Sequence, residues 1–224
     1  MRNIININEG WQFIREDAGL PTALPAWQIV NLPHTWNAVD GNDGNGSYYR
    51  GQCWYAREFA TPAQPLAGGR VFVEVLAAAL EATVYVNGTK AAYHEGGYSS
   101  FCVDVTDLCN PEGKNLLVIA CNNAEKSNIY PQMADFTFYG GLYRGVNIIS
   151  VPAAHFDLEH AGAKGFAVTP TPTDCGGALF TLESWVKNAD EAYTVQYSIA
   201  DAAGHEVAGC TRPADATKAE LFVP

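Results

Sequence analysis

One stretch of the sequence, residues 130–145, combines side chains that can do chemistry with aromatic rings and glycines. It reads YPQMADFTFYGGLYRG and carries one carboxylate, Asp135, and one guanidinium, Arg144. The carboxylate could accept charge-assisted hydrogen bonds from a ligand, or it could cap the turn before an FTFY strand. Arg144 follows two glycines, which permit unusual backbone angles. We expect a buried guanidinium there, paired with a carboxylate or with backbone carbonyls.

Two other stretches hold residue types that occur in functional sites. His34 in LPHTW could act as a general base, but no nucleophile accompanies it in the sequence, so a hydrogen-bonded structural role is favoured. The DGNDGNG run at residues 40–46 alternates side-chain oxygens with glycine, as a calcium loop does. It lacks the downstream Glu and the regular ligand spacing of such a loop, which favours a flexible loop.

Aromatic side chains in strand-like segments could stack on sugar rings. Tyr85 in VYVNG, Tyr98 in GGYSSF, and Trp54 with Tyr55 in QCWYAREF are the candidates. Packing between sheets is the favoured interpretation, because alternation assigns such residues to strand faces before any ligand is needed.

Acidic and metal-binding groups are the remaining source of chemistry. Hydrolysis of a glycosidic bond ordinarily requires two carboxyl groups that flank it. The chain has 24 acidic residues, but no pair among them is marked by the sequence, so we predict no catalytic residue. The six cysteines show no C-x-x-C pair and no histidine at zinc-ligand spacing, so we expect reduced thiols and no metal site.

Composition limits the classes of partner. The net charge of the 224 residues is −11 and no basic run occurs, so nucleic acid is a poor partner, whereas neutral ligands such as sugars are not repelled. The N-terminal MRNIININEGWQF has no apolar run of signal-peptide length, and no apolar stretch of roughly 18 residues follows. We therefore expect a cytoplasmic protein without membrane spans.

The elements that must position these residues are predicted to be short strands. Period-two alternation places Val71, Val73 and Val75 on one face, and it recurs in EATVYVNG, FCVDVTDL and NLLVIACN. Asn87-Gly88 is a hairpin turn signal, and the alanine-rich residues 76–82 are interpreted as a connection between strands. Short strands without long helices indicate an all-β, antiparallel sandwich of jelly-roll type.

The composition changes near residues 150–153. The remainder is rich in Ala, Thr and Pro, with strand-like segments LFTLESWVKN and YTVQYSIADAAGHEV. An immunoglobulin-like sandwich needs about 100 residues, and fewer follow, so we expect part of one. The predicted domains are residues 1–152 and 153–224.

An ordered set of motifs carries a family resemblance. INEGWQF, VNLPHTWNAVDGNDGNGSYYRGQCWYAREF, VYVNG, GGYSSFCVDVTDL and ADFTFYGGLYRGV together resemble the N-terminal sugar-binding domain of glycoside hydrolase family 2, over about residues 5–152. The resemblance extends to the β-galactosidase branch. The first domain would be a galactose-binding-like jelly roll. The segment after residue 152 resembles the start of the immunoglobulin-like domain that follows it in that family.

The resemblance implies an enzyme part without its own catalytic centre. In the family both catalytic glutamates lie in a later (β/α)₈ barrel, so this would be the non-catalytic N-terminal portion of a retaining β-galactosidase. Asp135 would reach into the barrel's active site, hold sugar hydroxyls and, in some members, help to bind a monovalent cation. A monovalent cation or magnesium is therefore the candidate cofactor of the full-length enzyme. The 40–46 loop lies near the active-site mouth in the family, which brings Asn42, Asp43 and Asn45 within reach of substrate.

Other functions stay open beside this one. A free-standing carbohydrate-binding module would bind sugar as this chain alone, and a structural or subunit-interface domain would not depend on Asp135. β-Glucuronidase and β-mannosidase are the near neighbours within the family. Two observations favour a β-galactoside or a related neutral glycan: the motifs GNDGNGSYYRG and DFTFYGGLYRG, and the lack of a basic cluster that could bind the carboxylate of a uronate. The full-length enzyme could form a homo-oligomer.

Overall fold

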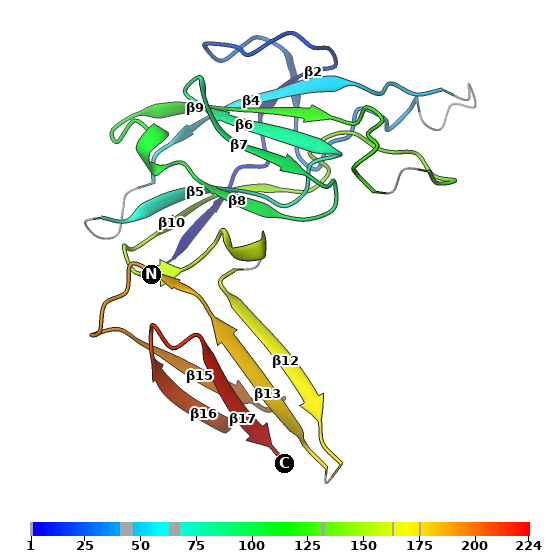
Figure 1. The fold of residues 1–224 in the computed structure, drawn as a ribbon. Coiled ribbons are helices and arrows are strands. Elements are labelled where there is room, and N and C mark those ends of the chain that lie inside the picture. The colour runs from blue at the N-terminus through cyan, green and yellow to red at the C-terminus, as the bar shows by residue number, and fades with distance from the viewer. Residues whose placement is uncertain (1, 41–46, 63–67, 131–132, 163, 175) are drawn as a thin grey trace. The chain divides into compact units, whose positions relative to one another are not determined.

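The structure is a computed structural model that describes residues 2–40, 47–62, 68–130, 133–162, 164–174 and 176–224. It is all-β, as predicted; its two short 3₁₀ helices in the described ranges are η1 (Thr106–Leu108) and η2 (His160–Gly162). The chain divides into two compact units (Figure 1). Unit 1 contains Met1–Pro65 and Arg70–Ser150, and unit 2 contains Leu66–Gly69 and Val151–Pro224.

Unit 1 is a β-sandwich of jelly-roll type, whose two sheets form separate layers in Figure 1. The larger sheet has the strand order β3-β2-β4-β9-β6-β7. Its strands are β2 (Trp11–Ile14), β3 (Gln28–Val30), β4 (Gln52–Ala60), β6 (Glu81–Val86), β7 (Thr89–Glu95) and β9 (Lys114–Asn122). The smaller sheet has the order β1-β10-β5-β8, with β1 (Asn3–Asn6), β5 (Arg70–Val75), β8 (Phe101–Asp104) and β10 (Val146–Val151).

The core of unit 1 lies between these two sheets. The larger sheet contributes side chains such as Tyr55 and Ile119, and the smaller sheet contributes Val73 and Ile148. Val71, Val73 and Val75 share the core face of β5, as the alternation predicts. Burying these apolar side chains stabilises the sandwich, at roughly 25 cal/mol for each Å² removed from water.

Strand β9 is apolar on both faces. Leu117, Ile119 and Cys121 belong to the main core. Val118 and Ala120 belong to a second buried cluster on the other face, with Trp54 and Ala56 of β4, and Leu116 packs against that cluster. The predicted alternation of Leu116, Val118 and Ala120 is therefore confirmed, but their shared face is not the one that meets the smaller sheet.

Two predicted connections appear where the sequence places them. Asn87 and Gly88 have φ angles of 50° and 81° and join β6 to β7 in a hairpin, because both positions need the left-handed region that Asn and Gly tolerate. The alanine-rich stretch runs from the end of β5 to the start of β6 without forming a helix. Within it, Ala79 forms an isolated β-bridge with Gly141.

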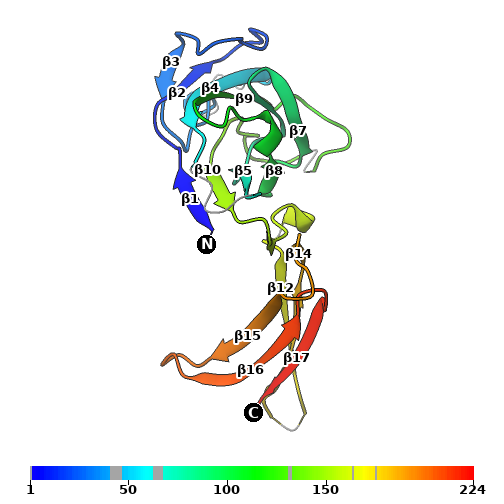
Figure 2. The same cartoon turned by 90° about the vertical axis from the view of Figure 1, so that its left-hand side faces the viewer.

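Unit 2 is a smaller, immunoglobulin-like β-sandwich. Its sheets have the orders β12-β13-β17, β15-β16 and β11-β14, and Figure 2 shows the hairpin of β15 and β16. The strands are β11 (His155–Phe156), β12 (Phe166–Pro172), β13 (Ala178–Ser184), β14 (Val186–Lys187), β15 (Thr194–Ala200), β16 (Glu206–Pro213) and β17 (Lys218–Val223). The core is built on Leu182, Val195, Tyr197, Ala214 and Ala219. Strand β12 lies at one edge of its sheet and carries Pro170 and Pro172.

The described residues contain five cysteines and no membrane-spanning helix. Cys53, Cys102, Cys109, Cys121 and Cys210 are thiols that lie outside any disulfide. Burial raises the pKa of the Cys53 thiol to about 12 and that of the Cys109 thiol to about 11. No helix in the described part of the chain has the length and apolar character needed to cross a bilayer.

Candidate functional site

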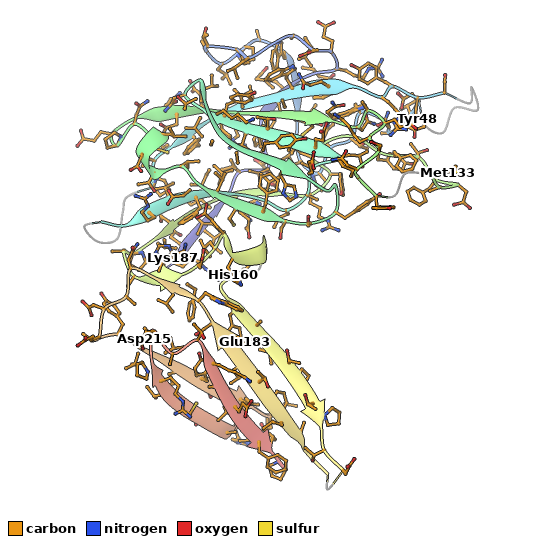
Figure 3. All side chains as sticks on the ribbon, viewed as in Figure 1. Tyr48, Met133, His160, Glu183, Lys187 and Asp215 are labelled. Atoms are coloured by element: carbon orange, nitrogen blue, oxygen red, sulfur yellow. The ribbon has the colours of Figure 1, made fainter. Side chains whose placement is uncertain are left out.

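The segment between β9 and β10 carries Asp135, and it lies at the end of the sandwich where β9 finishes. The chain just before β4 lies at the same end: Arg50 donates through Nε to the carbonyl of Asn123, at 2.8 Å, and the Gly51 amide donates to Asn123 Oδ1, at 2.9 Å. Figure 3 labels one residue from each stretch, Tyr48 and Met133, on this end of unit 1. The site candidates are therefore loop residues on a rigid two-sheet scaffold.

The LPHTW motif packs directly against the two glycines of the segment. The His34 amide donates to the carbonyl of Leu142 at 2.9 Å, and Thr35 Oγ1 donates to the carbonyl of Gly140 at 2.8 Å. A Cβ at Gly140 would overlap the indole of Trp36. Gly141 has a φ of 133°, and a Cβ there would overlap the carbonyl oxygen of His34. Only glycine at both positions allows this approach of the two backbones.

Asp135 projects from this anchored segment. Its side chain is exposed and makes no hydrogen bond or ion pair with any residue that the structure describes. The neighbouring Met133 is 91% exposed, and Phe136 is half exposed. The expected FTFY strand does not form, since residues 136–139 lie outside every described strand. Among the described residues, the Asp135 carboxylate therefore has no partner and caps no turn.

The other predicted substrate contacts, Asn42, Asp43 and Asn45, lie outside the described residues. Asp40, at the start of their loop, is described. Its carboxylate accepts from the Tyr49 amide at 3.0 Å and from Asn37 Nδ2 at 3.2 Å, and Arg15 lies 3.6 Å away. These contacts close the base of the loop, so Asp40 is held by protein groups.

Comparison with known proteins identifies the family. Residues 14–152 match the model of the sugar binding domain of glycosyl hydrolases family 2, which covers more than half of the chain. The chain belongs to glycosyl hydrolase family 2. The resemblance drawn from the sequence motifs is confirmed.

Individual family 2 relatives carry two different activities in their names. A solved structure described as an FMN-binding β-glucuronidase from Faecalibacterium prausnitzii L2-6 is 57% identical over 100% of this chain and 34% of its own, with a TM-score of 0.90. A β-glucuronidase of Bacteroides fragilis is 37% identical over 54% of this chain and 17% of its own. A β-galactosidase of Bacteroides ovatus is 28% identical over 91% of this chain and 24% of its own. The chain thus spans between 17% and 34% of the length of these family 2 proteins.

His34 has the structural role that the sequence favoured. Its Nδ1 is hydrogen-bonded to the hydroxyl of Tyr55 at 2.7 Å, and its ring packs edge-on against Phe13, with 4.6 Å between centroids. Burial lowers the pKa of His34 and raises that of Tyr55. Both groups are therefore neutral parts of the core wall near neutral pH.

The expected packing between the sheets is right for Tyr55 and wrong for Trp54, Tyr85 and Tyr98. Tyr55 lies in the main core, and Trp54 with Tyr85 packs in the outer cluster of the larger sheet. Tyr98 is 51% exposed, because it lies in the connection after β7, where strand alternation does not apply. Arg144 donates to the carbonyl of Tyr98 at 3.2 Å. Its expected backbone-carbonyl contact is present, but the guanidinium is exposed and not buried.

The described residues do not by themselves form the cation site that the family resemblance implies for the full-length enzyme. A sodium, potassium or magnesium ion is held by several oxygen ligands. Asp135 offers one carboxylate, and no group of three or more His, Cys, Asp or Glu side chains in the described part of the chain could hold a metal. We therefore derive no step through a cation.

Two residues that the sequence interpretation missed lie at this site. Asn37 and Asn123 are both fully buried, and they hydrogen-bond to each other across 86 positions of sequence. No sequence signal separates them from ordinary turn asparagines, since each follows a strand-like or turn-like stretch where asparagine is common.

Proposed function

We propose that this chain is the N-terminal, non-catalytic portion of a retaining family 2 glycosidase that hydrolyses β-glucuronides, and that Asp135 contacts sugar hydroxyls in the active site. The observation that carries the substrate class is the 57% identity, over the whole chain, to a protein described as a β-glucuronidase. The FMN named for that relative is not part of the proposal, because about two thirds of that protein lies outside the match.

A β-galactoside is the second candidate substrate. The sequence motifs favoured it, and the Bacteroides ovatus relative is named a β-galactosidase at 28% identity. That identity is half of the value for the β-glucuronidase relative, which is why we place the glucuronide first. The two sugars differ at C6, where a glucuronide carries a carboxylate, and in the configuration of the C4 hydroxyl, so the choice depends on groups that face C4 and C6.

Exposed apolar side chains support a role for the Asp135 segment at a contact with further protein. Tyr130 is 79% exposed and Met133 is 91% exposed, and Phe136 and Tyr139 are also exposed. Large apolar groups gathered in one exposed segment are a common mark of a binding surface. We propose that this surface contacts the remainder of the enzyme, which corresponds to the larger part of the length of the relatives.

The chemistry of a carboxylate suits the proposed contact. Asp135 can accept hydrogen bonds from two sugar hydroxyls at once, and such charge-assisted bonds are stronger than neutral ones. A glucuronide carboxylate would be repelled by Asp135. In the proposal Asp135 therefore binds hydroxyls of the ring away from C6, and the cation that recognises the C6 carboxylate comes from outside this chain.

The test of this proposal uses the full-length enzyme and two chromogenic substrates. We expect kcat/KM for p-nitrophenyl β-glucuronide to exceed that for the β-galactoside. Asp135→Ala should lower kcat/KM roughly ten- to a hundredfold, since one or two charge-assisted bonds are worth about 1.5–3 kcal/mol each. Asp135→Asn keeps the size without the charge and should recover part of the loss.

Three results would decide against parts of it. A higher kcat/KM for the β-galactoside than for the β-glucuronide would make the galactoside the first candidate substrate. Normal turnover by Asp135→Ala with a lowered Tm would make Asp135 a structural residue. Measurable affinity of this chain alone for glucuronic acid or galactose, without activity in the longer protein, would support a free-standing binding module.

A further inference from the structure

Asn37 is a fully buried amide with partners for each of its polar atoms. Its Oδ1 accepts from the Gly140 amide at 2.8 Å and from Asn123 Nδ2 at 3.1 Å. Its Nδ2 donates to the carbonyl of Tyr49 at 2.9 Å and to the carboxylate of Asp40 at 3.2 Å. A buried network with every member satisfied holds its surroundings in one arrangement.

Asn123 extends the network to a second position on the same segment. Its Nδ2 donates to the carbonyl of Phe138 at 2.9 Å, and its Oδ1 accepts from the Gly51 amide at 2.9 Å. The guanidinium of Arg50, which donates to the Asn123 carbonyl, lies 4.9 Å from the centre of the Phe138 ring. The side chains of the two asparagines thus hydrogen-bond to the backbone of Phe138 and Gly140. In a sheet, the backbone of a neighbouring strand would make these bonds.

These anchors follow Asp135 by three and five residues in the sequence. Tyr48 adds one more contact, because its hydroxyl accepts from the Phe138 amide at 3.1 Å. Asp135 itself has no side-chain bond to a described residue, so its placement depends on the backbone that these groups hold. A displacement of about 1 Å in a substrate-contacting group can cost a hundredfold in rate.

We propose that Asn37 is a positioning residue for Asp135: it fixes the backbone at Gly140 and Phe138, the latter through Asn123, and so presents the carboxylate to the sugar without touching it. This inference rests on the proposed role of Asp135. It adds a second, buried determinant of activity that no sugar contacts.

A matched control exists at the other end of β9. Asn115 is also buried, and its Oδ1 accepts from Asn87 Nδ2 at 2.8 Å and from the Asn110 amide at 2.6 Å, while its Nδ2 donates to Thr61 at 2.8 Å. Asn115 and Asn123 are eight positions apart, roughly 26 Å along a strand. Asn115→Ala therefore breaks an equivalent amide network far from the Asp135 segment.

The experiment is a double-mutant cycle in the full-length enzyme, with kcat/KM for p-nitrophenyl β-glucuronide and the β-galactoside as readouts. We expect Asn37→Ala to lower kcat/KM roughly ten- to a hundredfold in the presence of Asp135, and less than about twofold in the Asp135→Ala background, because no carboxylate is left to position. Asn115→Ala should lower Tm with kcat/KM kept.

The alternative outcomes separate the two proposals. Wild-type kcat/KM in Asp135→Ala overturns the proposed function. A damaging Asp135→Ala, combined with equal losses from Asn37→Ala in both backgrounds or with an equal loss from Asn115→Ala, overturns the positioning role.

A milder variant and a second readout cover the case in which Asn37→Ala does not fold. Tyr48→Phe removes one hydrogen bond to the Phe138 amide from a half-buried position and enters the same cycle with a smaller expected loss. Hydrogen exchange on this chain reports the anchor directly: Asn37→Ala should speed exchange at the Gly140 amide, whereas Asn115→Ala should not. Unchanged exchange at Gly140 would also overturn the inference.

Discussion

His34 is a titratable side chain whose state is set by burial. Its pKa lies below the ordinary value of 6.5 because the half-buried ring loses hydration that the charged form needs. The folded chain then binds a proton at His34 less readily than the unfolded chain does. The stability that the neutral ring contributes is present above about pH 6.5 and is lost as the pH falls through the unfolded value toward the folded one.

This gives a prediction for the pH dependence of unit 1. We expect the free energy of unfolding to decline between about pH 7 and pH 5, and His34→Gln to reduce that decline, because glutamine does not titrate. Urea titrations followed by tryptophan fluorescence measure it, since Trp11, Trp27, Trp36 and Trp54 all lie in unit 1. His205→Gln, at an exposed side chain of unit 2, is the control. An unchanged slope in His34→Gln would show that other groups cause the decline.

Residue chemistry was only partly accessible from the sequence. His34 could be assigned a structural role because it had no partner for catalysis nearby in sequence. Tyr98 and Arg144 were expected to be buried, and both are exposed. Strand alternation says nothing about a side chain in a connection such as Tyr98, and the two glycines before Arg144 bear on backbone angles and not on burial. Asn37 was missed because its partners, Asn123 and Gly140, lie 86 and 103 positions away in the chain.

At the scale of elements, β9 is the strand on which both hydrophobic clusters depend. It pairs with β4 on one side and β6 on the other, and it places alternate side chains in the main core and in the outer cluster. Burial on both faces explains why the sequence of β9 is continuously apolar. Alternation alone would predict a strand with one face exposed to solvent.

The two faces of β9 should differ in their sensitivity to truncation. Ile119→Ala should cost about 2–5 kcal/mol of unfolding free energy, because the side chain is fully buried and a cavity would remain in the main core. Leu116→Ala should cost less, since Leu116 is only half-buried at the edge of the outer cluster. Equilibrium urea unfolding of both variants makes the comparison. Equal costs would mean that the outer cluster stabilises unit 1 as strongly as the main core.

Several of the strands could be predicted, and the expected strand that does not form has a physical explanation. Alternation and the Asn87-Gly88 turn locate β5, β6, β7, β8 and β9. FTFY has strand-like composition, yet its backbone groups are satisfied differently: Tyr48 accepts from the Phe138 amide and Asn123 donates to the Phe138 carbonyl. Side-chain partners from distant loops override local propensity, and one sequence does not reveal them.

At the scale of the whole molecule, the chain matches only the smaller part of the length of its relatives. It spans 34% of the β-glucuronidase structure that is 57% identical to it. The sequence of this chain marks no pair of catalytic carboxyl groups. Asp135 would then be one contribution to an active site that is completed elsewhere, in agreement with the family resemblance, which places both catalytic glutamates in a later barrel.

We therefore expect this chain by itself to hydrolyse neither p-nitrophenyl β-glucuronide nor the β-galactoside. Glycoside hydrolysis needs an acid and a nucleophile on either side of the bond, and the sequence of this chain marks no such pair of carboxyl groups. Release of p-nitrophenol by the purified chain, against the full-length enzyme as the positive control, measures this. Turnover that persists through purification and disappears in Asp135→Ala would place a catalytic centre inside the chain.

The two prolines of β12 bear on how unit 2 behaves at high concentration. Pro170 and Pro172 pair with Phe180 and Ala178 of β13, and because they are two positions apart their ring nitrogens point to the same side. Proline is tolerated in a paired strand where its nitrogen faces away from the partner strand. The side of β12 that faces away from β13 is therefore expected to lack two backbone donors. A strand added along that edge would miss two backbone hydrogen bonds. Unit 2 is thereby protected at β12 against the edge-to-edge growth from which fibrillar aggregates form.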